Sequence, residues 1–425
     1  MIQIPPAGTA RQRGFTLIEV MVSLIVTVIV LLGVLALFDF SNKLSRVQTN
    51  ISDMQQSLRV AQTDAARLIR MAGRGGMPLG TVPTGWAVSV RDNVAAGSHI
   101  GDGTTPEVVP GSDVLAVRGV FTSPIYQVNT ADPAAFNLNS PLAPTSGTIR
   151  IRNTTPTAIP QDLTALKEAV QKNRPEALIL VSPQNAAVWA VVELNPSTSD
   201  VSNANEYVLG FTITGGSHTT DYLKFSSAGA GTYPADLTNV AYVGLLEEYR
   251  FYARQAFAVT GDATSDLTPK LSRARVYPGT EAPWEGKDEN WQADIADNIF
   301  DLQVALGLDT PAKDPAAPGC TGGTIASDEI NCGIYEAADG ENDDWMYNGE
   351  KVTDPLNFAN SDLHYVRLTT LARTDRRDKD YAAPTLVRVE NNKYDTPDTS
   401  VFNSAEERMY RRRILRTVID MRNLG

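Results

Sequence analysis

One acidic residue stands inside an otherwise apolar stretch near the N-terminus. Glu19 lies in the segment FTLIEVMVSLIVTVIVLLGVLALF, and the 19 residues from Val20 to Phe38 that follow it carry no charge. A carboxylate in an apolar environment costs roughly 2.5 kcal/mol or more unless a hydrogen-bonding or cationic group pairs with it. A helix that serves only as an anchor has no use for such a residue, so Glu19 is the first candidate for a functional side chain.

A second group of oxygen ligands lies far downstream, in the acidic segment DGENDD. Asp339, Glu341 and Asp343 alternate along the chain, and Glu350 is the twelfth residue counted from Asp339, as in calcium loops of the EF-hand type. Such a loop also needs glycine at its sixth position, where this chain has Asp344. The half match favours a solvated acidic loop and no bound cofactor, with calcium on the four carboxylates as the alternative.

Composition and motifs exclude several classes of function. The 425 residues carry 37 Lys and Arg against 49 Asp and Glu, a net charge of -12. We expect no nucleic-acid partner, because binding phosphates needs positive charge. The basic run 411–413 with Arg416 is more typical of a solvated strand face, or of ion pairs with Glu406 and Glu407. No nucleophile elbow, phosphate loop or zinc-protease motif occurs, so we predict a protein without enzymatic activity.

The apolar segment is long enough to cross a membrane, since about 20 helical residues span a bilayer core. Arg11 and Arg13 precede it, and no comparable basic cluster follows it directly. The positive-inside rule therefore leaves the N-terminus in the cytoplasm and sends the bulk of the chain outside. No small-residue cleavage site follows the segment, so we expect the mature protein to keep it. A plain signal anchor is the alternative.

The sequence RQRGFTLIEV at 11–20 resembles the class III signal of type IV prepilins and pseudopilins. In that family a membrane peptidase cuts after the glycine and methylates the new terminal residue. The resemblance implies removal of a leader over residues 1–14, cleavage after Gly14 and N-methylation of Phe15, with Glu19 as the fifth mature residue. It also implies three kinds of partner: the prepilin peptidase, other major and minor pilins, and the inner-membrane assembly machinery.

Cleavage would supply a partner for the acidic residue. The new amine at Phe15 is cationic and lies four residues before Glu19, about one helical turn. The carboxylate can pair with the amine of an adjacent subunit, which would set the axial register of a filament, or with the amine of its own chain. The resemblance favours the first arrangement, so assembly is the role that we expect for Glu19.

The helix that holds the apolar segment is predicted to continue well beyond it. Apolar residues recur at spacings of three and four, which is typical of a helix with one apolar face. They are Leu44, Val47, Ile51, Met54, Leu58, Ala61, Ala65, Leu68 and Ala72. Residues 15–72 are therefore expected to form one helix of about 87 Å, with 15–40 in the membrane or in a filament core. We expect the second half to dock on the chain's own sheet; a coiled coil between copies is the alternative.

Residues 73–425 are predicted to form an α+β head, an antiparallel sheet with long loops. Two shorter helices are expected, over Gln161–Asn173 and over Ala293–Gly307, where aliphatic residues recur at helical spacing. The Pro-, Gly- and Asp-rich stretch 310–362 is expected to be the longest loop. Nine strands are predicted, at Trp86–Val90, Asp113–Phe121, Ala177–Val181, Ala186–Leu194, Tyr207–Ile213, Leu245–Ala253, Lys270–Val276, His364–Arg373 and Arg413–Met421.

Two cysteines, Cys320 and Cys332, fall in the longest of the expected loops. Disulfides persist outside the cytoplasm, and a bridge that closes a loop of this size adds about 3 kcal/mol in the chain-entropy model. We therefore expect a structural disulfide between them. A redox pair is the alternative, although the C-x-x-C motif is absent.

Parts of the head are similar to PilW-type minor pilins, with the J-class pseudopilins of type II secretion as close relatives. They are GSDVLAVR, the hairpin ALILVS…AAVWAVVEL, NIFDLQVALGLD and the C-terminal YRRRILRTVIDMRN. The resemblance implies a type IV pilin-like fold and a minor pilin that primes or caps the pilus. The alternatives are a tip adhesin that presents its loops to a surface or receptor, and a pseudopilin. It further implies a prepilin in the inner membrane with its head outside the cytoplasm, and later a place in the pilus at the cell surface.

Overall fold

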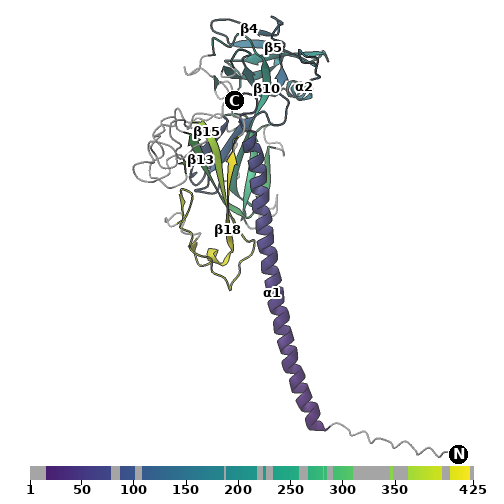
Figure 1. Ribbon diagram of the computed structural model, residues 1–425, viewed down its shortest axis with the longest axis vertical. Helices are drawn as coiled ribbons and strands as arrows, with labels where there is room; N and C mark the ends of the chain where they lie inside the picture. The colour runs from purple at the N-terminus through teal and green to yellow at the C-terminus, as the bar shows by residue number, and fades with distance from the viewer. Residues whose placement is uncertain are drawn as a thin grey trace, which may run out of the picture. The chain divides into compact units, whose positions relative to one another are not determined.

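One long helix, one short helix and antiparallel sheets hold most of the residues that the structure describes (Figure 1). The computed structural model describes residues 16–77, 87–100, 108–185, 188–217, 224–225, 233–257, 267–280, 282–284, 291–309, 345–347, 362–394 and 403–421. The chain divides into two units, Met1–Asp53 and Met54–Gly425, and the boundary falls within the long helix. The α+β class with a long apolar N-terminal helix, predicted above, is confirmed.

The long helix, α1, spans Leu17–Arg70. In the second unit its buried residues follow the predicted spacing of three and four, and they join a core cluster with residues of both large sheets. They are Met54, Leu58, Ala61, Ala65, Ala66, Leu68 and Ile69, and the polar Gln62 is buried as well. Docking of the helix on the chain's own sheets is thus confirmed from Met54 onward, while Leu44, Val47 and Ile51 belong to the first unit.

A glycine-rich turn ends α1. Gly73, Gly75 and Gly76 all have positive φ, a conformation that side chains with a Cβ rarely adopt. A Cβ on Gly75 would lie 2.6 Å from Val120 Cγ2, and one on Gly76 would lie 2.8 Å from Val181 Cγ2. The backbone of the turn therefore lies directly on the sheet, closer than any other residue type would allow.

Twelve strands form the larger sheet. They are β1 (Val88–Arg91), β2 (Val114–Gly119), β3 (Tyr126–Gln127), β4 (Phe136–Leu138), β5 (Ser146–Arg152), β6 (Ala177–Val181), β7 (Trp189–Asp200), β8 (Glu206–Thr212), β9 (Lys224–Phe225), β10 (Tyr242–Phe257), β11 (Leu267–Val276) and β12 (Gln292–Asp297). The main order is β1-β2-β10-β6-β7-β8-β5-β4; β3 and β11 also pair with β10, β9 with β7 and β12 with β11. Every pair is antiparallel.

Strand β10 changes partners in its middle. Its first residues pair with β6, whereas the stretch from Glu247 pairs with β2 and β11. At the change-over, Glu247 accepts hydrogen bonds from the backbone N–H groups of residues 121 and 122, and Arg275 lies 2.7 Å from its carboxylate. Glu248 is buried between Arg118 and Arg250, at 2.6 and 2.7 Å. Burial alone would raise the pKa of Glu248, but the two guanidinium groups hold it below its ordinary value.

A second sheet has the order β14-β13-β15-β18, and Figure 1 shows its longer strands side by side. Its members are β13 (Ile299–Asp309), β14 (Trp345–Met346), β15 (Asp362–Arg373) and β18 (Arg412–Asp420). Between β15 and β18 the chain forms the small pair β16 (Arg388–Val389) and β17 (Asn392–Lys393) and the 3-10 helix η3 (Glu407–Met409).

The two sheets are joined through a buried aspartate. The Asp113 carboxylate accepts hydrogen bonds from the backbone N–H groups of Asn93 at 2.8 Å and Val304 at 2.7 Å, and the Asp113 N–H donates to the Leu302 carbonyl. Nearby, buried Asp301 accepts hydrogen bonds from Tyr394 and from other side chains. Burial raises the pKa of Asp301 to about 6 and that of Asp113 well above its ordinary range.

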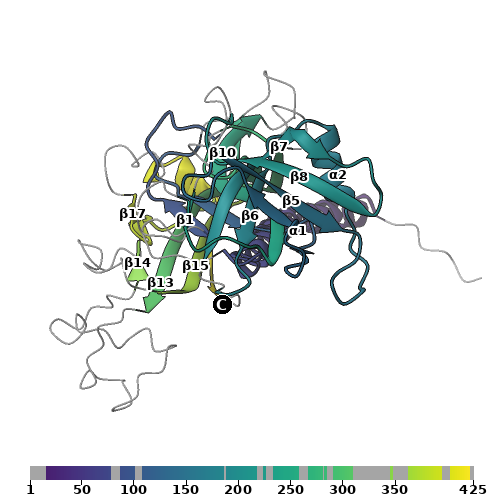
Figure 2. The ribbon, with the colours of Figure 1, turned by 90° about the horizontal axis from the view of Figure 1, so that it is seen from above.

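The head has two main hydrophobic cores, and alternate residues of β6 point into each of them. Ile179 and Val181 join the core that contains α1, whereas Leu178 and Leu180 join a core that contains the short helix α2 (Thr164–Gln171). We call residues 54–77 with β1, β2, β11–β15 and β18 the helix-covered region. We call α2 with β3–β9 and Tyr242–Leu246 of β10 the α2 region; Figure 2 shows α2 close to β7.

All nine predicted strands are confirmed, β6 at its predicted ends and the others at shifted ends, as β1, β2, β6, β7, β8, β10, β11, β15 and β18. The helix predicted over Gln161–Asn173 is present as the shorter α2. Of the expected loop 310–362, the described residues include β14 and the first residue of β15.

The helix predicted over Ala293–Gly307 is wrong, because this segment forms β12 and β13. Asn298, at φ 62°, separates the two strands. An irregularity in the pairing between Ile299 and Asp301 then shifts the alternation by one residue. The shifted alternation spaces aliphatic residues three and four apart, which imitates a helix. Because both faces of β13 are buried, no polar face marks it as a strand.

Candidate assembly site

The start of α1 is closed by reciprocal hydrogen bonds between Thr16 and Glu19. The Glu19 Oε2 atom accepts from the Thr16 backbone N–H at 2.9 Å and from the Thr16 hydroxyl at 3.1 Å. The Glu19 N–H donates to Thr16 Oγ1 at 3.3 Å. This is a capping box, in which a Thr at the N-cap and a Glu three residues later satisfy each other's backbone donors. Glu19 therefore has a local role in starting the helix, besides the assembly role expected for it.

The described hydrogen bonds engage only one of the two oxygens of this carboxylate. Both bonds from Thr16 end on Oε2, and no hydrogen bond or ion pair of Oε1 occurs within the described residues. A carboxylate can accept several hydrogen bonds at once. Glu19 can thus cap its own helix through Oε2 while Oε1 accepts from a cationic group of another chain.

An uncovered apolar surface surrounds this carboxylate. Large apolar side chains from Leu17 to Phe40 are exposed, for example Leu17 at 81% and Leu37 at 69%. The hydroxyl of Thr27 donates to the Ser23 carbonyl at 2.8 Å, so that a polar group within the stretch is satisfied inside the helix. In the described part of the chain, α1 is the helix that has the length and composition to cross a membrane. The apolar segment must be buried by lipid or by other chains.

Gly33 does not interrupt the helix, which runs continuously through it. A Cβ built on this residue meets nothing within 4 Å. No contact with a residue that the structure describes therefore requires a glycine at this position. The residue costs the isolated helix about 1 kcal/mol relative to alanine.

Several predicted site residues lie outside the described residues. These are the processing residues Gly14 and Phe15, the two cysteines Cys320 and Cys332, and the calcium candidates Asp339, Glu341, Asp343 and Glu350. The cleavage position, the disulfide and calcium binding therefore stay predictions. Within the ranges that the structure describes, no group of three or more His, Cys, Asp or Glu residues is arranged to hold a metal ion.

The basic run near the C-terminus pairs with carboxylates of the head. Arg411 lies 2.8 Å from Asp378, and Arg416 lies 2.9 Å from Glu390. Ion pairs of the basic run are thus confirmed for Arg411 and Arg416, with carboxylates other than those expected, while Arg412 donates to the backbone carbonyl of Glu407 at 3.0 Å. Glu406 and Glu407 pair instead with Arg377 at 3.2 Å and Arg373 at 2.6 Å. The reason is the fold, which brings the loop after β15 and the pair β16–β17 close to these arginines, and the sequence does not reveal that proximity.

Sequence reasoning missed the role of Thr16, although the signal was present. The pattern Thr-x-x-Glu directly before an apolar run is the sequence signature of a capping box. The cost of a carboxylate in an apolar segment drew attention to Glu19 alone, and its nearest polar neighbour was overlooked.

The geometry defines a class of protein: a long helix with an exposed apolar first half and a single carboxylate near its start, followed by a head built of antiparallel sheets. Residues 9–35 match the family model of the prokaryotic N-terminal methylation motif. Residues 256–423, from the end of β10 through β18, match the model of the type IV pilus-assembly protein W. No curated protein and no solved structure matches the chain.

The two matches support the prediction of a class III signal protein of the type IV pilin kind, and the C-terminal part of the chain is similar to PilW. The second match relates it to pilus assembly as a minor pilin. The first implies processing by a prepilin peptidase and, with the apolar helix, anchoring in a membrane. Both families are structural and not catalytic.

Proposed function

We propose that this protein is a minor pilin that enters the pilus through α1 and primes or caps the filament, with its head outside the cytoplasm. The observation that carries the proposal is the exposed apolar surface of α1 around the Glu19 carboxylate, whose Oε1 accepts no hydrogen bond from the described residues. Burying that surface among the helices of other pilins supplies the driving force for incorporation. The pairing of Glu19 Oε1 with the terminal amine of a neighbouring chain supplies the register.

The size of the head supports a position at an end of the filament, where the protein would prime or cap it. A major subunit repeats along the whole filament, and every addition to its head must be packed against many identical copies. A head of about 350 residues, with stretches such as 310–362 between its strands, is compatible with one or a few positions at an end. Deletion of the gene is accordingly expected to lower the number of pili per cell, counted by electron microscopy.

Three substitutions separate the two roles of Glu19. Glu19→Ala removes both the cap and the charge. Glu19→Gln keeps an amide oxygen that can cap the helix but removes the charge. Thr16→Ala removes the cap and keeps the charge. Leader cleavage and membrane content, measured by immunoblot, are expected to stay normal in all three variants.

Incorporation into purified pili is the deciding measurement. Both Glu19 variants are expected to lose about a hundredfold or more of their content in pili, since breaking a buried ion pair costs about 3–5 kcal/mol. Thr16→Ala is expected to be incorporated. Normal pili containing Glu19→Gln would refute the intersubunit pair. Normal piliation in the deletion strain with lost attachment would favour a tip adhesin, and lost protein secretion would favour a pseudopilin.

A further inference from the structure

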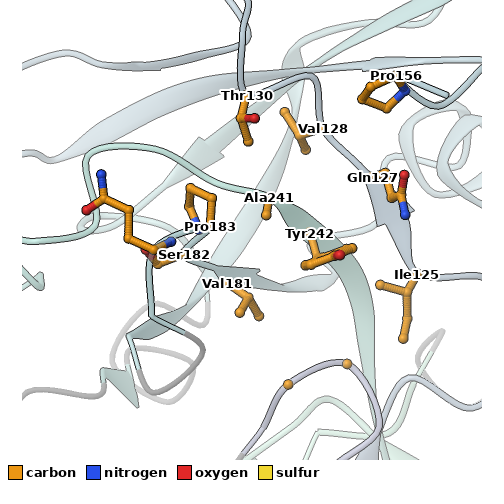
Figure 3. Close-up of a pocket in the computed structure, with 13 residues that line it drawn as sticks. Ile125, Gln127, Val128, Thr130, Pro156, Val181, Ser182, Pro183, Ala241 and Tyr242 are labelled. Atoms are coloured by element: carbon orange, nitrogen blue, oxygen red, sulfur yellow. The ribbon is translucent and has the colours of Figure 1, made fainter.

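An open pocket of about 770 Å³ lies in the head, beside the glycine turn that follows α1 (Figure 3). Its volume falls in the range of roughly 300–1,000 Å³ that is usual for small-molecule sites. Figure 3 shows Tyr242 and Ala241 in the middle, with Gln127 and Pro156 on one side and Ser182 and Pro183 on the other. Gly75 and Gly76 belong to the same lining.

The pocket exists because α1 does not reach this part of the sheet. Gln127, Tyr242 and Val181 pair directly across β3, β10 and β6, so their side chains share one face. Val181 belongs to the core that contains α1, and the turn at Gly76 packs against it. Beyond that turn the face is open, and Tyr242 remains 43% exposed. A large aromatic side chain is thus presented on a rigid sheet next to a fixed backbone turn.

A peptide strand cannot extend the sheet here. At Tyr242, strand β10 already pairs with β3 on one side and with β6 on the other. The outer edge of β3 is closed by a side chain: the Gln127 N–H donates to Gln161 Oε1 at 2.7 Å, and Gln161 Nε2 donates to the Gln127 carbonyl at 3.1 Å. A ligand must therefore lie on the face of the sheet and be recognised by side chains.

The chemistry of the lining is neutral and mixed. No Asp, Glu, Lys, Arg or His is among the residues that line the pocket, which disfavours both anions and cations as ligands. Gln127, Thr130, Gln184 and Tyr242 carry hydrogen-bonding side chains, and no hydrogen bond engages these side chains within the described part of the chain. Ile125, Val128, Val181 and Ala241 supply apolar surface between them.

We propose that this pocket binds a neutral carbohydrate. The apolar C–H face of a sugar ring packs on the ring of Tyr242, because aromatic side chains supply rigid apolar contact area. The two glutamine amides donate to and accept from the sugar hydroxyls, which present the same mixture of donors and acceptors. The proposal does not depend on the proposed role in assembly, because none of the lining residues comes from the apolar half of α1.

The test uses the full-length protein in a zwitterionic detergent without a sugar headgroup. Maltotriose, chitotriose and mannotriose are the neutral probes, and trigalacturonate is the anionic comparison. Saturation-transfer NMR and calorimetric titration measure binding. The variants are Tyr242→Ala, Tyr242→Phe and the double change Gln127→Ala with Gln184→Ala. The control is Leu142→Ala, at a residue that is 98% exposed and does not line the pocket.

We expect at least one neutral trisaccharide to bind. Tyr242→Ala is expected to weaken binding roughly tenfold, and Tyr242→Phe to weaken it less because the ring is kept. The double glutamine variant gives an independent reading if Tyr242→Ala unfolds, and should also weaken binding by roughly tenfold. The proposal is overturned if none of the three neutral sugars binds, if only trigalacturonate binds, or if binding is unchanged in a folded pocket variant.

Discussion

The helix-covered region and the α2 region cover their sheets in different ways. In the first, the second half of α1 and the smaller sheet bury a common core, and most of its strands lie within the stretch that matches the pilus-assembly model. In the described part of the α2 region, the eight-residue α2 is the only helix. This region lies outside both family matches. There Tyr242 and its neighbours stay open. The difference separates a region whose strands lie mostly within the match to the pilus-assembly model from a region that neither match covers.

The largest effect is expected from Leu58→Ala. Leu58 is 1% exposed in the core of the helix-covered region, and such a change costs about 2–5 kcal/mol. Hydrogen exchange should then speed up in β13 and β15 more than in β5 and β8. Val60→Ala, at a residue of α1 that is 46% exposed, is the matched control and should change stability by less than about 0.5 kcal/mol. Equal loss of protection in both regions would show that they unfold as one.

A second test concerns pH and the helix-covered region alone. Asp301 has a folded-state pKa of about 6 against an ordinary value of 3.8, so the folded chain binds the extra proton between those two values. Stability contributed by this group is complete below about pH 4 and is lost as the pH rises through 6, by at most about 3 kcal/mol. Asp301→Asn removes this loss. Denaturation of both proteins from pH 4 to 7 should give a flatter profile for the variant, and parallel profiles would contradict the assignment.

The smallest effect is expected in the α2 region. Gln161→Ala removes both hydrogen bonds that close the edge of β3 and should cost about 1 kcal/mol. The exchange of the Gln127 amide should speed up, while strands of the smaller sheet keep their protection. Gln161→Glu keeps the acceptor and loses the donor, so it should protect that amide better than alanine does. No change at Gln127 would mean that the edge is closed by other means.

Most elements could be predicted from sequence because their patterns are local. The stripe from Met54 to Ala72 shows its period directly in the residues, and the nine strands either alternate or are rich in Val, Ile, Leu and Tyr. The segment Ala293–Gly307 was wrongly predicted to be a helix. An irregular pairing near Ile299 and burial on both faces remove the alternation of polar and apolar residues that marks a strand.

The candidate sites divide in the same way. Glu19 could be found because a charge in an apolar run is a local signal. The pocket could not, because Gln127, Val181 and Tyr242 are each separated by more than fifty residues and only the register of β3, β6 and β10 brings them together. The same holds for Gln161, whose role depends on meeting an edge formed by β3.

The central claim is that the apolar half of α1 remains on the mature protein and begins at a processed terminus. Intact-mass and terminal-peptide mass spectrometry of the protein from membranes and from pili tests it directly. The account predicts a chain that starts at Phe15, carries one methyl group on its amine and keeps the segment through Phe40 in both fractions. A mature chain that starts elsewhere, or one released without that segment, would contradict it.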